Sequence, residues 1–467
     1  MSQHINIQTK RILSDAHTPV SVYLKMRDLY SGCILLESSD YYGNEKNYSY
    51  ICFDDLCSIE VKNGLIKTSV DKRYTNTILH SSEVTGYVNN FLNSFTFQQA
   101  DNDHLQGKFF GHINYDSVRY FDTIELPPTS DENIPDLRLH AYKYVIVFDH
   151  YHHSVYLTQH SFNPDEESEL SHIESALRMN YFNNFYFKTQ GEETSDCSDD
   201  DYKEIVNRGI SHCQRGDVFQ IVLSRSFSRQ FKGDEFNVYR ALRMINPSPY
   251  LFYFDYGDYR IFGSSPEAQI KVKNGKAIIH PIAGTAKRTG NREEDEGALE
   301  ALINDAKENA EHVMLVDLAR NDLSKSFGKV EVAYFKNIQE FSHVVHMVSE
   351  VTGKDAQHDN ILQVMGETFP AGTLSGAPKF KAMELINSLE FSSRSFYGGC
   401  AGFMQPGSET NQAIMIRSFL SKDHTLHFRA GAGITVNSIP ENELNEVSHK
   451  LKALRAAISL AQETTMN

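Results

Sequence analysis

Residues 308–322 read Glu-Asn-Ala-Glu-His-Val-Met-Leu-Val-Asp-Leu-Ala-Arg-Asn-Asp and cover the second half of a helical pattern that spans about 293–321. Glu308 and Glu311 are three positions apart, so they share one helix face. Glu443 and Glu446 repeat this spacing in a second helical pattern. Two such helices could build an oxygen-rich Mg²⁺ site. On spacing alone, solvated helix edges with ordinary ion pairs are the more common explanation.

The second of these helical patterns, at about 440–462, also shows which of its faces is buried. Its apolar stripe recurs at helical spacing and consists of Leu444, Val447, Leu451, Leu454 and Ile458. Glu443, Glu446 and Lys450 each precede a stripe residue by one position. We therefore expect these three charged side chains to border the core.

The remaining pattern divides the chain in two. Residues 1–187 mix short strand-like runs with loops, residues 188–198 form a polar, acidic linker candidate, and residues 199–462 alternate helices with strands. Further helical patterns are expected at about 199–215, 235–245, 358–368 and 377–389. Strand-like runs lie at 219–223, 250–254, 268–272, 412–419 and 425–430. This alternation predicts an α/β or α+β fold.

Bulk composition excludes several classes of protein. The 467 residues carry a net charge of −16, which argues against nucleic-acid binding because that relies on Lys and Arg. No apolar run reaches the roughly 18 residues of a membrane span, and the N-terminus lacks a secretory apolar segment. The six cysteines are scattered. A soluble, cytoplasmic protein without a zinc site is the expectation.

Two glycine-containing segments follow strand-like runs, at 281–285 and 429–434. Glycines at strand ends let backbone N–H groups approach a carboxylate, although a tight turn explains them equally well. His346 lies in an apolar run, where it is either a core histidine or a proton carrier. Arg417 ends an apolar run and could either grip a carboxylate or lie at the surface.

The order of the motifs resolves these alternatives. The chain carries, in sequence, residues 216–220, 263–267, 281–285, 308–322, 369–379, 397–399, 416–418, 431–434 and the 443–450 helix. In this order they resemble the chorismate-binding enzymes across residues 199–462. The resemblance implies large, antiparallel-rich sheets sandwiched together with helices outside, in two interleaved subdomains.

Two positions discriminate within that family. Related aminodeoxychorismate synthases commonly have a lysine nucleophile where this chain has Ala283, which offers no nucleophilic atom. Isochorismate and salicylate synthases use a lysine base where this chain has Gln220, a neutral amide. The resemblance therefore favours a lyase of the anthranilate synthase type, acting on chorismate and ammonia. The alternatives are aminodeoxychorismate synthase and a non-catalytic tryptophan sensor.

The same resemblance implies roles for individual residues. Glu311 and Glu446 would bind Mg²⁺ directly, with Glu308 and Glu443 acting directly or through water. Catalytic roles are implied for Gln220, Thr285, Glu308 and His346. Substrate-binding roles are implied for Gly284, Thr285, Tyr397, Arg417, Gly431, Ala432, Gly433 and Lys450.

The N-terminal half resembles the tryptophan-inhibited members of the family. The motif at 35–38 and the motif at 246–250 imply an inhibitor site formed by Leu36, Glu37, Ser38, Pro247, Ser248, Pro249 and Tyr250. The chain has no Gly-x-Cys-x-Gly nucleophile elbow of its own. The resemblance thus implies a glutamine amidotransferase partner, in an expected heterotetramer.

Overall fold

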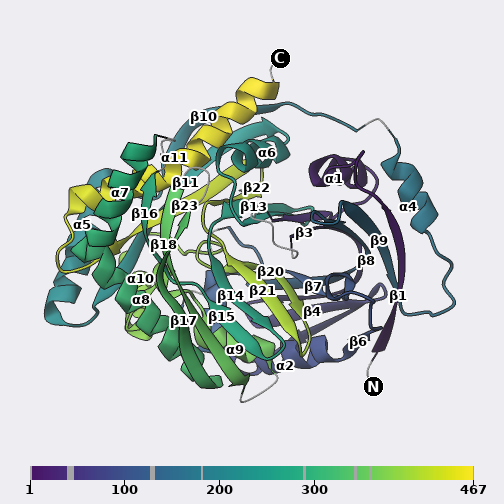
Figure 1. Ribbon diagram of the computed structural model, residues 1–467, viewed down its shortest axis with the longest axis horizontal. Coiled ribbons are helices and arrows are strands. Elements are labelled where there is room, and N and C mark those ends of the chain that lie inside the picture. The colour runs from purple at the N-terminus through teal and green to yellow at the C-terminus, as the bar shows by residue number, and fades with distance from the viewer. Residues whose placement is uncertain are drawn as a thin grey trace.

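A computed structural model describes residues 3–38, 47–126, 132–179, 182–287, 291–340, 344–356 and 360–465. Strands from both halves of the sequence stand side by side in the middle of the molecule (Figure 1). Helices cover the outside. None of the described helices combines the length and the apolar composition that a membrane-spanning helix needs.

One antiparallel ladder joins the two halves through β2. Its strands, each hydrogen-bonded to the next, are β1 (Gln3–Leu13), β9 (Ser154–Ser161), β8 (Leu137–Asp149), β3 (Tyr48–Lys62), β2 (Ile34–Glu37), β12 (Tyr250–Asp255), β13 (Tyr259–Ser265), β22 (Ser418–Lys422), β23 (Thr425–Ile434), β11 (Gln220–Gly233) and β10 (Phe187–Ser195). The N-terminal strand β2 therefore pairs directly with β12 of the second half.

A second antiparallel ladder branches from β8 and again crosses between the halves. It runs through β7 (Phe109–Ile113), β20 (Cys400–Gln405), β21 (Glu409–Ile414), β14 (Ala268–Lys273), β15 (Lys276–Ile279), β18 (Val344–Ala356) and β17 (Phe327–Glu340), and β16 (Ile282–Lys287) also pairs with β18. The expected antiparallel-rich, interleaved α/β architecture is confirmed.

Short strands complete the sheets. They are β4 (Leu65–Val70) and β5 (Arg73–Ile78) beside β3, β6 (Phe95–Phe97) parallel to β1, and β19 (Gly376–Ala377) beside β11. The helices are α1 (Pro19–Arg27), α2 (Ser81–Asn93), α3 (Val118–Phe121), α4 (Leu170–Leu177), α5 (Asp199–Arg215), α6 (Phe236–Ile245), α7 (Arg292–Asn304), α8 (Ala306–Ser324), α9 (Ile361–Thr368), α10 (Lys379–Leu389) and α11 (Pro440–Thr465), with 3₁₀ turns at Asp103–Leu105, Tyr115–Ser117 and Gly372–Leu374.

The acidic segment expected as a linker has structure of its own. Strand β10 occupies most of residues 188–198 and pairs with β11. Ser198 then caps α5 by accepting a hydrogen bond from the Asp201 backbone N–H, and Asp199–Asp201 place negative charge at the helix N-terminus. The acidic residues therefore stabilise a helix start.

The expected helix at 293–321 is divided at Asp305. The backbone of Asp305 is extended, with a ψ of 114°, and this conformation ends α7. Its side chain then accepts a hydrogen bond from the Glu308 backbone N–H at 3.0 Å, the contact of an N-terminal cap. Glu308 therefore lies in the first turn of α8.

Helix α11 packs its apolar stripe onto β23, α5 and α6. The stripe residues Leu444, Val447, Leu451, Leu454 and Ile458 are all buried, as the periodicity predicted. Apolar packing therefore fixes the orientation of the helix that carries Glu443 and Lys450.

Candidate active site

The candidate site is built around the glycine-rich end of β23. Strand β11 runs antiparallel to it, with Val222 opposite Gly433 and Ser224 opposite Gly431. The Gln220 side-chain amide donates to Glu311 Oε1 on α8 at 2.9 Å. A Cβ atom at position 433 would lie 2.6 Å from Gln220 Nε2. Glycine at this position therefore lets the Gln220–Glu311 pair sit against the strand backbone.

Helix α11 reaches the same strand from a second direction. Lys450 donates to the Gly431 carbonyl oxygen at 2.9 Å and forms an ion pair with Glu446 at 2.8 Å. Glu443 is buried, and burial, together with the charges of Glu443 and Glu446, raises the pKa of the Tyr202 hydroxyl on α5. The two Glu-x-x-Glu steps thus converge on β23, one from α8 and one from α11.

The bulge in β16 contributes the third wall. Gly284 has a φ of +70°, and a Cβ there would lie 3.2 Å from Glu308 Oε2. His346 on β18 pairs with Thr285 and hydrogen-bonds to the Gly284 backbone. Burial, reinforced by nearby Arg417, lowers the pKa of His346 to about 4. Its imidazole is therefore neutral at physiological pH and can act as a polar contact.

Arg417 and Glu267 are half-buried and interact electrostatically, which the sequence did not predict. Arg417 adopts a left-handed φ of 48° between β21 and β22 and donates to Asn246 at 3.4 Å. Burial raises the pKa of Glu267 to about 7, although the Thr373 hydroxyl, Arg417 and Lys450 all favour its ionised form. Thr373 donates to Glu267 Oε1 at 3.1 Å. Glu267 can therefore hold or release a proton near neutral pH.

Electrostatic interactions connect the charged and polar residues of the candidate site with one another. The charge of Lys450 favours the ionised form of Glu267, and Glu267 favours the charged form of Arg417. Arg417 in turn disfavours a charged His346. Tyr397 is buried and also feels Lys450. The sequence motif 263–267 could have indicated Glu267, because it places a carboxyl group between two buried strands. The side chains of Ala283 and Thr285 lie outside the described part of the structure.

The carboxylates of α8 and α11 have the oxygen donors that Mg²⁺ prefers. In the described conformation Glu311 accepts the Gln220 amide and Glu446 pairs with Lys450. Among the described residues, no three His, Cys, Asp or Glu side chains form a metal-sized cluster. The donor chemistry fits Mg²⁺, provided that both carboxylates exchange these partners for the ion.

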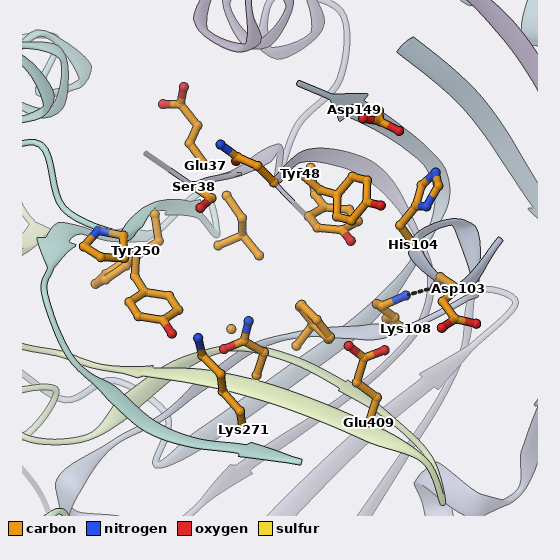
Figure 2. A pocket seen from close by; sticks show the side chains of 18 of the residues that line it. Glu37, Ser38, Tyr48, Asp103, His104, Lys108, Asp149, Tyr250, Lys271 and Glu409 are labelled. Atoms are coloured by element: carbon orange, nitrogen blue, oxygen red, sulfur yellow. Dashed lines mark hydrogen bonds between the residues drawn. The ribbon is translucent and has the colours of Figure 1, made fainter. Parts of the chain in front are cut away.

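A separate cavity of about 1250 Å³ lies between the two halves (Figure 2). Its lining includes five predicted inhibitor residues, Leu36, Glu37, Ser38, Pro249 and Tyr250. The structure does not place the other two in that lining; Ser248 is buried and hydrogen-bonded to Asn246.

The polar groups of this cavity are unevenly arranged. The Glu37 carboxylate points away from it (Figure 2) and accepts hydrogen bonds from Tyr239 at 2.7 Å and Arg243 at 2.9 Å. Lys271 and Glu409 rise from the strands below, and the Lys271 ammonium lies 5.3 Å from the centre of the Tyr250 ring. Sequence reasoning missed Lys271 because its position depends on the β14–β21 pairing.

The family of chorismate-binding enzymes matches residues 48–456. This chain belongs to that family. The chain is 33% identical over 471 residues to "Anthranilate synthase component 1" of Aquifex aeolicus (strain VF5). The alignment covers 97% of this chain and 94% of that protein. The Methanothermobacter marburgensis protein of the same name is 35% identical over 452 residues, covering 95% and 94%.

Solved structures of chorismate-binding enzymes share the fold. Anthranilate synthase component I from Streptococcus pneumoniae TIGR4 superposes with a TM-score of 0.76 at 28% identity, covering 96% of this chain and 99% of that one. MenF, the menaquinone-specific isochorismate synthase from Escherichia coli, reaches 0.75 at 16% identity, covering 98% and 95%. The second likeness concerns the fold alone.

The raised pKa of Glu267 predicts a pH-dependent cost to stability. Between its ordinary value of 4.5 and about 7, the native state keeps a proton that the unfolded chain has lost. The free energy of unfolding should therefore fall as pH rises through this window, by about 1–3 kcal/mol. Glu267→Gln removes that loss, which urea unfolding at several pH values would measure.

The matched control for this measurement is Glu384→Gln, on the exposed side of α10. It should follow the wild-type pH dependence. Parallel curves for wild type and Glu267→Gln would show that the Glu267 carboxyl does not titrate in this window.

Proposed function

We propose that this chain is the chorismate-using component of an anthranilate synthase, which converts chorismate and ammonia to anthranilate and pyruvate. The observation that carries the proposal is Gln220, whose neutral amide donates to Glu311 in the candidate site. An amide cannot take a proton from water as a base would. Ala283 likewise offers no nucleophile. Attack by ammonia is then the chemistry left to this site, and the names of the relatives support it.

The ring carboxylate of chorismate is proposed to bind at the end of β23. Backbone groups of Gly284, Gly431, Ala432 and Gly433, with the Thr285 hydroxyl and Lys450, would surround it. Glu311 and Glu446, assisted by Glu308 and Glu443, would hold Mg²⁺, which supplies positive charge against this carboxylate. A local positive charge is needed because the protein as a whole carries −16.

The enolpyruvyl carboxylate is proposed to bind Arg417, with Tyr397 beside it. A guanidinium can grip a carboxylate with two parallel hydrogen bonds, and burial strengthens that interaction. The neutral His346 would contact the ring near C4. Glu267, which can be protonated near neutral pH, would assist loss of the C4 hydroxyl as a proton donor. Ammonia attacks C2, and elimination of pyruvate makes the ring aromatic.

The test of this function is product identity. The purified chain is incubated with chorismate, Mg²⁺ and ammonium at mildly alkaline pH, and anthranilate is followed by its fluorescence. We expect anthranilate and pyruvate in equal amounts. Formation of 4-amino-4-deoxychorismate, identified by mass, would assign the chain to the aminodeoxychorismate route and refute the proposal. No turnover with intact fold would favour a tryptophan sensor.

Removal of one metal ligand tests the Mg²⁺ proposal. Glu311→Gln keeps the shape of the side chain but removes its charge, so Mg²⁺-dependent turnover should fall by at least about 100-fold. The circular dichroism spectrum and the urea midpoint should remain those of the wild type. Glu300→Gln, on the exposed side of α7, is the control. Unchanged turnover in Glu311→Gln would remove this residue from the metal site.

A glutamine amidotransferase subunit is proposed as the source of ammonia. The relatives are named component 1, which implies a second component. We propose a heterotetramer of two chains of each kind, located in the cytoplasm.

Tryptophan is proposed to inhibit the enzyme from the 1250 Å³ cavity. The indole would pack on Pro249 and Tyr250, since aromatic rings stack favourably. Lys271 would pair with the carboxylate of the inhibitor. Strands β14 and β21, which form this end of the cavity, lead directly to Glu267 and Arg417. The Ile414 backbone N–H also donates to the Glu267 carbonyl at 3.0 Å. This pairing supports coupling between the two sites.

Lys271→Gln tests the proposed carboxylate contact. Loss of a charged hydrogen bond should raise the tryptophan concentration for half-inhibition by about tenfold or more. Activity without tryptophan should stay within about twofold of wild type, because Lys271 lies outside the catalytic site. Lys329→Gln on β17 is the control, because its side chain is exposed. Unchanged inhibition in the Lys271 variant would place the inhibitor carboxylate elsewhere.

A further inference from the structure

A second, smaller cavity of about 220 Å³ lies beside Tyr115 and Arg394. It is formed by the turn before α3, by the C-terminal end of α10 and by the segment that follows α10. The polar side chains in its lining include Tyr115, Asp116, Asn387, Glu390, Ser393 and Arg394. None of these residues has a role in the mechanism proposed above.

Two buried hydroxyl groups of this cavity lack a hydrogen-bond partner among the described residues, and a carboxylate lines the cavity beside them. Asp116 is 5% exposed, and within the described residues its carboxylate accepts no hydrogen bond. The buried hydroxyls of Tyr115 and Ser393 also have no hydrogen-bond partner there. Glu390 differs, because it accepts hydrogen bonds from Ser224 at 2.8 Å and from Arg394 at 2.6 Å. The Asp116 carboxylate lines the cavity, where a bound molecule could donate hydrogen bonds to it.

The charges around Asp116 make it a proton carrier. Burial, with the charges of Asp136 and Glu132, raises its pKa to about 7 against the opposing effect of Arg119 and Arg429. Glu390 and Arg394 also line the cavity and largely offset each other's charge. Both forms of the Asp116 carboxyl are therefore populated near neutral pH.

Arg394 contacts both Tyr115, which lines this cavity, and Tyr397, which is proposed to bind the substrate. The Arg394 guanidinium lies 4.8 Å from the centre of the Tyr115 ring and 5.9 Å from that of Tyr397. A Cβ atom at Gly398 would lie 3.3 Å from the Tyr115 ring and 3.5 Å from Leu374. Tyr115 thus lines the small cavity while packing against the loop that carries Tyr397.

The chemistry of the lining selects a small donor. A carboxylate and two hydroxyl oxygens suit a molecule that has several N–H groups and carries positive charge at neutral pH. Ammonium meets this description, and the proposed reaction consumes ammonia. Chorismate, a dianion, would be repelled by Asp116.

We propose that this cavity receives ammonium and that Asp116 removes one of its protons, so that neutral ammonia passes to chorismate beside Tyr397. One N–H bond breaks, its electron pair stays on nitrogen, and the proton adds to an Asp116 carboxylate oxygen. Asp116 returns the proton to water at the open side of the cavity. This inference rests on the proposed anthranilate synthase activity.

Steady-state kinetics of Asp116→Asn with ammonium chloride tests the route. Near neutral pH the KM for ammonium should rise by about tenfold or more, because the amide cannot accept the proton. The KM for chorismate and the kcat at saturating ammonium should stay within about twofold of wild type. At alkaline pH, where ammonia itself is abundant, the difference in ammonium KM should shrink. A purely structural role for Asp116 would not raise the KM for ammonium while leaving the KM for chorismate and kcat unchanged.

Two further variants complete the experiment. Ser393→Leu, which fills the cavity, should raise the ammonium KM at every pH, whereas Asp122→Asn, an exposed residue of the same segment, should behave as wild type. An unchanged ammonium KM in both Asp116→Asn and Ser393→Leu would overturn the route while leaving the anthranilate activity intact. The same holds if the KM for chorismate rises in parallel. Absence of anthranilate from the wild-type chain would instead refute the proposed function, and this route with it.

Discussion

The buried ion cluster of Glu390, Arg394 and Arg429 is the constraint on which the rest of the structure depends. Glu390 accepts from Arg394 at 2.6 Å and from Arg429 at 3.0 Å, and all three side chains are at most 3% exposed. Arg394 also donates to the carbonyl groups of Leu374 and Val222. Such a cluster gains little net stability, yet losing one partner costs about 3–5 kcal/mol because a charge is left buried alone. The cluster therefore fixes the relative positions of the elements that it joins.

The elements joined by this cluster are those that shape the candidate site. Arg429 belongs to β23, Val222 to β11, and Leu374 to the loop before β19. The register of β11 and β23 then sets where Gly431 and Gly433 face α8 and α11. A rigid backbone suits a site that positions two reactants, since correct placement accounts for a large part of the rate. The local cations Arg417 and Lys450 offset the negative charge of the protein.

Apolar periodicity predicted the parts of the fold that depend on local pattern. The α11 stripe is one case, because its spacing alone fixes the buried face. Features that depend on distant partners were missed. β10 forms in an acidic segment because β11 offers it a hydrogen-bonding edge. The run expected at 412–419 is split by the left-handed Arg417. The raised pKa values of Glu267 and Asp116 arise from burial, which no spacing of residues reveals.

The measurement that tests the account most directly is a crystal structure of the chain with Mg²⁺ and chorismate. We predict Mg²⁺ between Glu311 and Glu446, the ring carboxylate at the backbone of Gly431–Gly433, and the enolpyruvyl carboxylate on Arg417. Chorismate bound with either carboxylate outside these groups, or Mg²⁺ held by other side chains, would contradict this prediction.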